Sequence, residues 1–174
     1  MSVMTSRTNI LVGLCGVVLA MTVPSAIAAP AHAAPGSQGS SAQRLVFIGK
    51  DAKLGINDNG APGSSAGDVR TLALTMTTAS GTVVGTADVV QTLTDEGAVD
   101  RAVKTLVISL PKGTISGMGL TTFNDFISPT SRPNDRIEQI AIVGGTGKYR
   151  GASGVIDIEI LPNFNSRWRI SLDG

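Results

Sequence analysis

Cysteine and histidine are nearly absent from this chain of 174 residues: the single cysteine is Cys15 and the single histidine is His32. Residues 44–174 contain neither. This excludes disulfides, thiol nucleophiles and Ser/His/Asp triads from that region, together with the His- or Cys-rich sites that zinc, copper and haem usually need. Carboxylates, lysine, tyrosine and water remain for proton transfer. We therefore expect no metal site and no cofactor.

Runs of like charge are also missing. The chain has 14 basic and 13 acidic residues, and without Arg7 the balance is 13 to 13, because residues 1–40 contain no Asp or Glu. A surface of this kind does not attract nucleic acid or an anionic membrane strongly. We expect neither as a partner.

The N-terminal segment has the layout of a bacterial-type secretory signal. Arg7 precedes an apolar run at 10–23, which is followed by Pro24 and small residues up to 34. The run is short for a membrane span, although an uncleaved anchor is the alternative. Cys15 does not form a lipoprotein site, because Leu14 precedes it and the apolar run continues. We expect a signal peptide at 1–34, cleaved within 28–35, a flexible linker at 35–43, and a secreted protein with no stable membrane anchor.

Residues 44–174 are predicted to form one all-β domain. Segments that alternate in polarity are separated by Gly, Pro, Asn and Asp, and no amphipathic helix is evident. The predicted strands are 44–50, 69–77, 82–93, 102–110, 113–126, 137–143, 152–161 and 166–172. Eight strands at this spacing indicate a sandwich or a closed barrel, and closure removes exposed edges.

Alternation along each strand predicts which side chains face the interior. The predicted interior set is aliphatic: Leu72, Leu74, Met76, Leu106, Ile108, Leu110, Met118, Leu120, Ile140, Ile142, Ile156, Ile158, Ile160, Trp168, Ile170 and Leu172. Glu138 and Lys104 break this pattern, because each has the parity of apolar neighbours. We expect both to reach solvent at a barrel mouth.

The stretch IVGGTGKYRGASG, residues 142–154, looks at first like a phosphate-binding loop. A Walker loop requires a glycine five residues before its Gly-Lys pair, a Ser or Thr after the lysine, and a following helix. Here Ile142 and Tyr149 occupy those two positions, and the next residues alternate like a strand. The glycines are therefore interpreted as a hinge between two strands.

The same stretch carries a family resemblance. The residues from Ile140 to Arg150, followed by Ala152 and Gly154, resemble the signature of dirigent proteins and of the related allene oxide cyclase barrels. Residues 117–123 and 81–86 are similar to that superfamily too. The resemblance implies an eight-stranded antiparallel β-barrel with an apolar lumen, commonly dimeric or trimeric. Ser153 stands where plant dirigent proteins usually have Arg, which weakens lignan-type chemistry. The alanine-rich end of the leader and the high content of Gly, Ala and Thr look bacterial, which favours, by analogy of fold, the branch of bacterial Diels-Alderases and spirocyclases.

These observations predict a cofactor-free cyclase or isomerase for an apolar, reactive small molecule of polyketide or lipid type, acting by positioning and a few polar contacts. The alternatives are a secreted hydrophobic-ligand carrier without turnover and a structural or inhibitory protein whose barrel interior is filled. Glu138 is the candidate general acid, and its alternative is a surface ion pair with Lys104 or an arginine. Tyr149 is a candidate donor at the mouth, or else a ring packed across the turn. The predicted substrate-binding residues, each of which would equally suit a plain barrel core, are Leu74, Met76, Met118, Leu120, Ile158 and Trp168.

Overall fold

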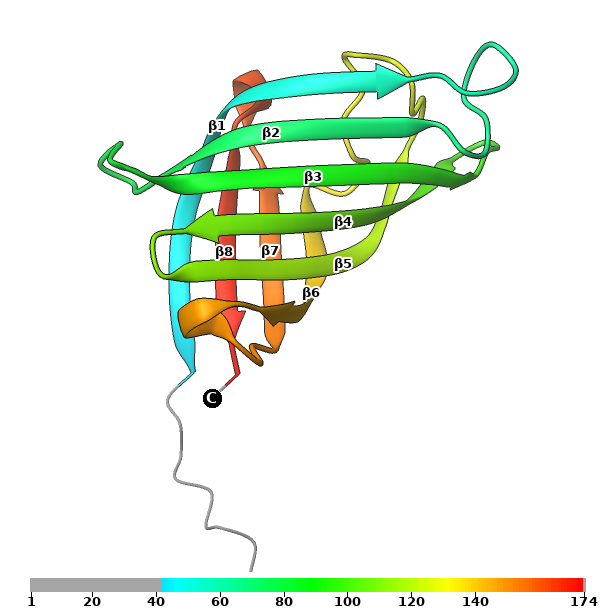
Figure 1. Ribbon diagram of the computed structural model, residues 1–174. Coiled ribbons are helices and arrows are strands. Elements are labelled where there is room, and N and C mark those ends of the chain that lie inside the picture. Colours follow the sequence, from blue (N-terminus) through cyan, green and yellow to red (C-terminus); the bar gives the residue numbers. More distant parts are fainter. Residues whose placement is uncertain (1–41, 174) are drawn as a thin grey trace, which may run out of the picture. The chain divides into compact units, whose positions relative to one another are not determined.

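The computed structural model describes residues 42–173. The predicted signal peptide and nearly all of the predicted linker, with Cys15 and His32, lie outside the described residues. The described chain consists of eight strands and two single-turn 3-10 helices (Figure 1). Their bounds are β1 Gln43–Asn57, β2 Val69–Thr77, β3 Val83–Asp95, β4 Asp100–Leu110, β5 Gly113–Phe123, β6 Ile137–Gly145, η1 Gly147–Tyr149, β7 Gly154–Ile160, η2 Pro162–Phe164 and β8 Ser166–Leu172.

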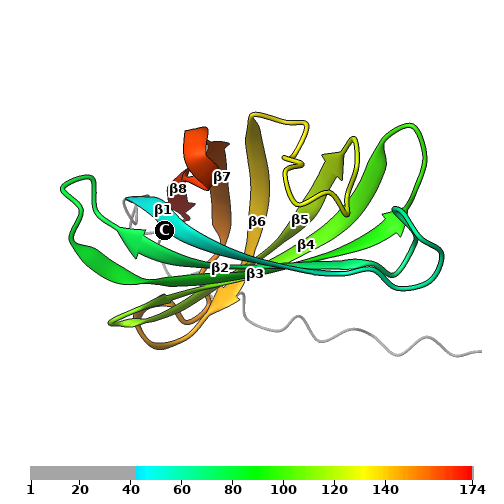
Figure 2. The same cartoon turned by 90° about the horizontal axis from the view of Figure 1, so that it is seen from above.

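The eight strands form a closed barrel in sequence order. Every neighbouring pair is antiparallel, and β1 closes the barrel by pairing with β8, where Phe47 lies opposite Trp168. The sheet curls back on itself in the view from above (Figure 2). The predicted all-β, eight-stranded antiparallel barrel is thus confirmed. Within residues 42–173, no helix is long and apolar enough to cross a membrane.

The barrel interior is aliphatic because apolar residues recur at every second position of the strands. Ile108, Ile140, Ile156 and Ile170 are completely buried in one cluster with their neighbours. A smaller cluster of Leu93, Ala102, Phe123 and Phe126 lies where β3 and β5 end and β4 begins. The Phe123 and Phe126 rings meet edge to face, with their centroids 5.3 Å apart.

The predicted orientation of β5 is wrong. Met118 and Leu120 point outward and are 49% and 63% exposed. The inward positions belong to Gly117 and Gly119, because the side chain of Ile140 on β6 lies where a Cβ on either glycine would be. In the middle of β5 the two inward residues are glycines, so the large apolar side chains of this part of the strand lie on the outer face. Alternation of large apolar residues therefore predicted the wrong side.

The first strand is longer than predicted. It continues to Asn57 through an irregularity between Lys50 and Lys53, where the pairing with β2 shifts. Asp51 lies in this irregularity with φ of 54°. Such a bulge lets a strand bend and continue, whereas the sequence pattern suggested an end.

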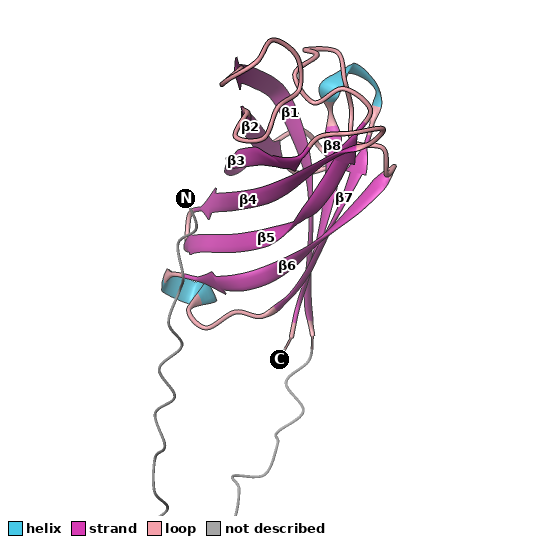
Figure 3. Ribbon diagram, turned by 90° about the vertical axis from the view of Figure 1, so that its right-hand side faces the viewer, coloured by secondary structure: helices cyan, strands magenta, loops and turns pink. Residues whose placement is uncertain are grey.

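The glycine hinge lies between β6 and β7, as predicted. The chain makes the single turn of η1 there, and Gly147 has φ of 57°. A Cβ on Gly147 would also overlap the carbonyl oxygen of Lys112 in the neighbouring β4–β5 turn. The motif therefore packs against the β4–β5 turn at one end of the barrel. Figure 3 shows η1 and η2 at opposite ends.

Candidate functional site

A cavity of about 250 Å³ opens at the barrel end where the odd-numbered strands finish and the even-numbered strands begin. Its walls are mostly apolar, and Leu72, Leu74, Val89, Ile158 and Trp168 contribute to them. The volume is slightly below the roughly 300–1,000 Å³ usual for small-molecule sites. The cavity therefore suits a compact ligand, or the reacting part of a longer one.

A row of polar side chains crosses one wall of this cavity. Arg70 on β2 lies opposite Gln91 on β3, and Gln91 lies opposite Lys104 on β4. All three point inward, are at least 96% buried, and line the cavity. The next position in the row, on β5, is Gly119, which has no side chain. The lysine can therefore reach across to β6.

Lys104 forms an ion pair with Glu138 of β6, with 2.5 Å between Nζ and Oε1. The exposed fractions of the two side chains are only 5% and 2%. Burial lowers the pKa of Lys104, and the charge of Glu138 and the hydrogen bond to it partly oppose that effect. The expectation that both residues reach solvent is wrong. They pair with each other inside the barrel, which the interior parity of both positions already indicated.

Arg70 holds the loop that covers the cavity. Its Nη1 donates to the carbonyl oxygen of Phe126 at 2.7 Å and to that of Ser128 at 3.4 Å, and its Nη2 donates to that of Ser131 at 3.2 Å. The guanidinium also lies over the Phe123 ring, 4.8 Å from its centroid. Burial lowers the pKa of Arg70, although Asp125 acts in the opposite direction.

Several buried polar atoms in this region have no hydrogen-bond partner among the described residues. They are Arg70 Nε, Gln91 Oε1, Glu138 Oε2 and Thr121 Oγ1. The first three belong to residues that line the cavity. Buried polar atoms are nearly always paired, and exceptions occur at ligand and catalytic sites. Because most of these atoms belong to residues of one cavity, we expect a ligand or water to provide their missing hydrogen bonds.

Two loops form the mouth of the cavity. Pro129, Arg132 and Pro133 come from the β5–β6 loop, and Phe164 comes from η2. The Arg132 guanidinium lies 3.4 Å from the centroid of the Phe164 ring. Asn163 and Phe164 both have φ of 58°, an uncommon conformation for a residue with a side chain. This turn directs the Phe164 ring toward Arg132, and the contact joins the two loops.

Apart from Tyr149, the predicted site residues separate into three groups. Glu138, Leu74, Ile158 and Trp168 line the cavity. Met76 is completely buried in the apolar cluster but does not line the cavity. Met118 and Leu120 lie on the outer face of the barrel, as described above.

Tyr149 lies at the opposite end of the barrel from Glu138. It is 8% exposed and packs in the apolar cluster next to Gly145, at the end of β6. Glu138 is at the beginning of the same strand, seven residues earlier, which corresponds to roughly 23 Å along a strand. The two candidate catalytic residues therefore do not share a site. The Tyr149 ring is packed in the barrel core, which agrees with the packed ring that was the alternative to a donor at the mouth.

Sequence reasoning missed Arg70, Gln91 and the two mouth loops. The signal for the first two was present: Arg70 has the parity of Leu72 and Leu74, and Gln91 has the parity of Val89 and Leu93. Alternation therefore placed both inside the barrel. Arg132 and Phe164 had no such signal, because loops have no periodicity.

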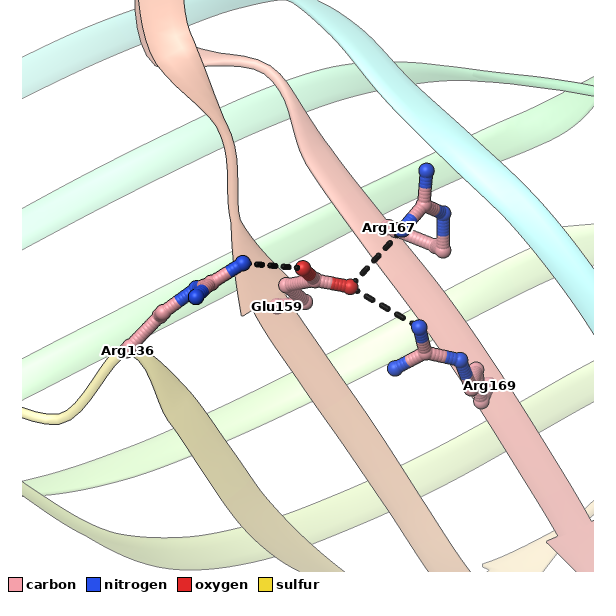
Figure 4. Close-up of polar contacts among 4 residues, drawn as sticks. All are labelled: Arg136, Glu159, Arg167 and Arg169. Carbon is pink, nitrogen blue, oxygen red and sulfur yellow. Dashed lines mark hydrogen bonds and ion pairs between the residues drawn. The ribbon is translucent and has the colours of Figure 1, made fainter.

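A second charged cluster lies on the outer face of the barrel (Figure 4). Glu159 of β7 accepts hydrogen bonds from Arg167 and Arg169 of β8, both at 2.8 Å, and from Arg136 at 3.1 Å. These bonds, led by that from Arg169, lower the pKa of Glu159 although burial opposes them. The cluster connects β7 with β8 and with the residue before β6. None of its members lines the cavity.

The family follows from a sequence match that covers most of the barrel. The model described as "allene oxide cyclase barrel like domain" matches residues 50–170. The chain belongs to this family. A search of curated protein sequences finds no significant match. Between residues 42 and 173, no three His, Cys, Asp or Glu side chains come together as they would around a metal ion.

Solved structures of the same fold belong to proteins with different activities. A pyocyanin demethylase is 20% identical with a TM-score of 0.62, and the match covers 75% of this chain and 99% of that one. AbnU, an exo-specific intermolecular Diels-Alderase, is 20% identical with a TM-score of 0.58 and coverages of 78% and 100%. The pterocarpan synthase dirigent protein GePTS1 is 20% identical with a TM-score of 0.50 and coverages of 75% and 82%. At these identities the similarity establishes the fold and leaves the reaction open.

Proposed function

We propose that the protein is a cofactor-free cyclase or isomerase that binds an apolar, reactive small molecule of polyketide or lipid type and folds it toward an intramolecular ring closure. The cavity volume of about 250 Å³ restricts the enclosed part of the substrate to a compact reacting segment. Holding two reacting groups in the correct orientation replaces most of the entropic cost of their meeting. The barrel provides rigid walls for that purpose.

The cavity residues have different roles in binding the substrate and stabilising charge on it. Trp168 provides a flat wall, fixed by the hydrogen bond from its Nε1 to Ser166 Oγ at 2.7 Å. Leu74 and Ile158 provide aliphatic contacts. Lys104 and Gln91 lie where they can stabilise charge that develops on a substrate oxygen, and such stabilisation is strong in a water-poor site. Glu138, as the anionic partner of Lys104, is suited to accept a proton, so we revise its expected role from acid to base.

The observation that carries this proposal is the cavity itself, with apolar walls and unpartnered polar atoms of Arg70, Gln91 and Glu138 at one side. A structural barrel with a filled interior has no use for buried polar atoms that lack partners, because each costs about 1–3 kcal/mol. AbnU, a Diels-Alderase of the same fold, supports a cyclase. The dirigent protein supports the second candidate, a carrier without turnover.

Product analysis separates the two candidates. Native mass spectrometry of the protein from its producing strain, with extraction of bound molecules, would provide the ligand. Incubation of that ligand's linear precursor with purified protein should give a cyclised product faster than buffer does. Trp168→Ala and Glu138→Gln should slow this reaction. Gln139→Ala is the matched control, because Gln139 is the outward-facing neighbour of Glu138. If the protein binds the precursor but gives no product, the carrier function is supported. If the protein is isolated empty and binds no apolar molecule, the filled structural barrel is supported.

Two further expectations belong to this proposal. The leader supports secretion, with the folded barrel acting outside the cell.

An outer stripe of apolar residues supports a homodimer or homotrimer: Met118 and Leu120 on β5, Ala141 and Val143 on β6, and Val155 on β7. Met118, Ala141 and Val155 are cross-strand neighbours. The exposed fractions of Leu120 and Val143 are 63% and 61%. Contiguous apolar surface of this kind marks association sites.

A further inference from the structure

We infer that Lys104 is a covalent capture site for carbonyl compounds, and that its amine forms an imine with an aldehyde or ketone bound in the cavity while Glu138 transfers the protons. The inference rests on the proposed function only in requiring that the cavity binds ligands. It adds a substrate class, carbonyl compounds, and a covalent step.

The first support is the position of the lysine. Lys104 lines a cavity with largely apolar walls, and its side chain is 5% exposed. Most lysines extend into water, where the amine is protonated and cannot attack a carbonyl. A lysine enclosed by apolar walls is easier to deprotonate, and enzymes use such lysines to form Schiff bases. The direction of the pKa of Lys104, lowered by burial, agrees with this position.

The second support is the carboxylate beside it. Imine formation requires a group that removes a proton from the amine and later returns one to the departing oxygen. Glu138 Oε1 lies 2.5 Å from Lys104 Nζ, and Glu138 Oε2 has no partner among the described residues. One oxygen can therefore act on the lysine while the other acts on the ligand. A purely structural ion pair does not require a free second oxygen.

The step balances without any co-reactant. Glu138 removes a proton from the Lys104 ammonium, and the neutral amine attacks the carbonyl carbon, so that a C–N bond forms and the carbonyl π electrons move to oxygen. Glu138 returns its proton to that oxygen and removes a second one from nitrogen. It then protonates the hydroxyl, which leaves as water when the C–O bond breaks. The product is a protonated imine, and its positive charge remains paired with the Glu138 carboxylate.

Reductive trapping tests the inference. The folded protein is incubated with benzaldehyde and sodium cyanoborohydride, and the adducts are located by peptide mapping. We expect one benzyl group per chain at Lys104, formed before the exposed Lys112 and Lys148 react. Unfolding the protein in urea before the reaction should remove this preference. Benzaldehyde adducts confined to exposed lysines or to the N-terminal amine would overturn the inference.

Two variants distinguish covalent capture from simple binding. Lys104→Arg keeps a cation beside Glu138, and hence a folded barrel, but a guanidinium does not form the imine, so the adduct at residue 104 should be lost. Glu138→Gln should slow trapping at Lys104 without changing trapping at Lys112. Equal trapping rates in Glu138→Gln and in the unsubstituted protein would overturn the role of Glu138.

Toluene, which has no carbonyl, separates this inference from the proposed function. Its binding is followed by ligand-observed NMR. If toluene binds and competes with an apolar substrate while benzaldehyde gives no adduct at Lys104, imine formation at Lys104 is contradicted and ligand binding in the cavity is supported. If neither toluene nor benzaldehyde occupies the cavity, both proposals fall.

Discussion

At the scale of single residues, Lys104 and Glu138 depend on each other. Removing one member of a buried ion pair leaves an uncompensated charge and typically costs about 3–5 kcal/mol. We expect Lys104→Met to lower the free energy of unfolding by about that amount. Urea denaturation followed by the fluorescence of Trp168, the single tryptophan, measures it.

The double variant Lys104→Met with Glu138→Leu is the control. Because it removes both charges and fills the same space with apolar atoms, it should recover most of the lost stability. A loss below about 1 kcal/mol in the single Lys104→Met variant would contradict the buried pair.

The sequence indicated the members of this pair but not their environment. Alternation showed that Lys104 and Glu138 face the interior. Because lysine and glutamate are rarely fully buried, both were expected to extend into solvent. Their strand positions did not reveal that Gly119 leaves a free path between them, since a contact from β4 to β6 depends on the register of β5. The interior position of Trp168 was predictable, because its neighbours on β8 alternate regularly.

At the scale of secondary-structure elements, the glycine hinge makes a matched test possible. Gly147 and Gly151 have φ of 57° and 73°, so alanine is strained at both positions. This strain costs about 1–2 kcal/mol. At Gly147 the added Cβ also overlaps the Lys112 carbonyl oxygen, whereas at Gly151 it meets open space. We expect Gly147→Ala to lower the free energy of unfolding clearly more than Gly151→Ala does, as measured by urea denaturation. Equal losses would show that the contact between the hinge and the β4–β5 turn is unimportant.

The connection between β7 and β8 through Glu159 predicts a dependence on pH. Because the arginines lower its pKa in the folded state, Glu159 adds stability above the ordinary glutamate pKa of 4.5, and this contribution is lost as the pH falls through the lowered folded-state value. We expect Glu159→Gln to be less stable than the unsubstituted protein at neutral pH, with a difference that shrinks in acid.

Denaturation curves across the acidic range check the Glu159 prediction. Added salt should also reduce the difference at neutral pH, because exposed arginines are screened. A difference between the two proteins that is independent of both pH and salt would assign the effect to packing.

At the scale of the whole molecule, closure of the sheet was predictable and closure of the cavity was not. Eight alternating segments with turn residues between them favour a barrel, and the hinge motif resembles a barrel family. The mouth depends on Arg70, whose three bonds to main-chain carbonyls hold residues 126–131 over the cavity. Hydrogen bonds between a strand and a distant loop leave no periodic trace in the sequence, so the site's cover became visible only in the folded chain.

The outer stripe leads to the last prediction, which concerns assembly. Stable protein interfaces bury about 800 Å² per partner, with an apolar centre, and a charge placed in that centre is costly. We expect native mass spectrometry to show a dimer or trimer, and Leu120→Lys to shift it toward the monomer while circular dichroism stays that of a β-barrel. Val83→Lys is the control, because Val83 is 66% exposed but lies outside the stripe, at the start of β3. A protein that is monomeric without any substitution would contradict assembly, and equal dissociation by both lysines would place the interface elsewhere.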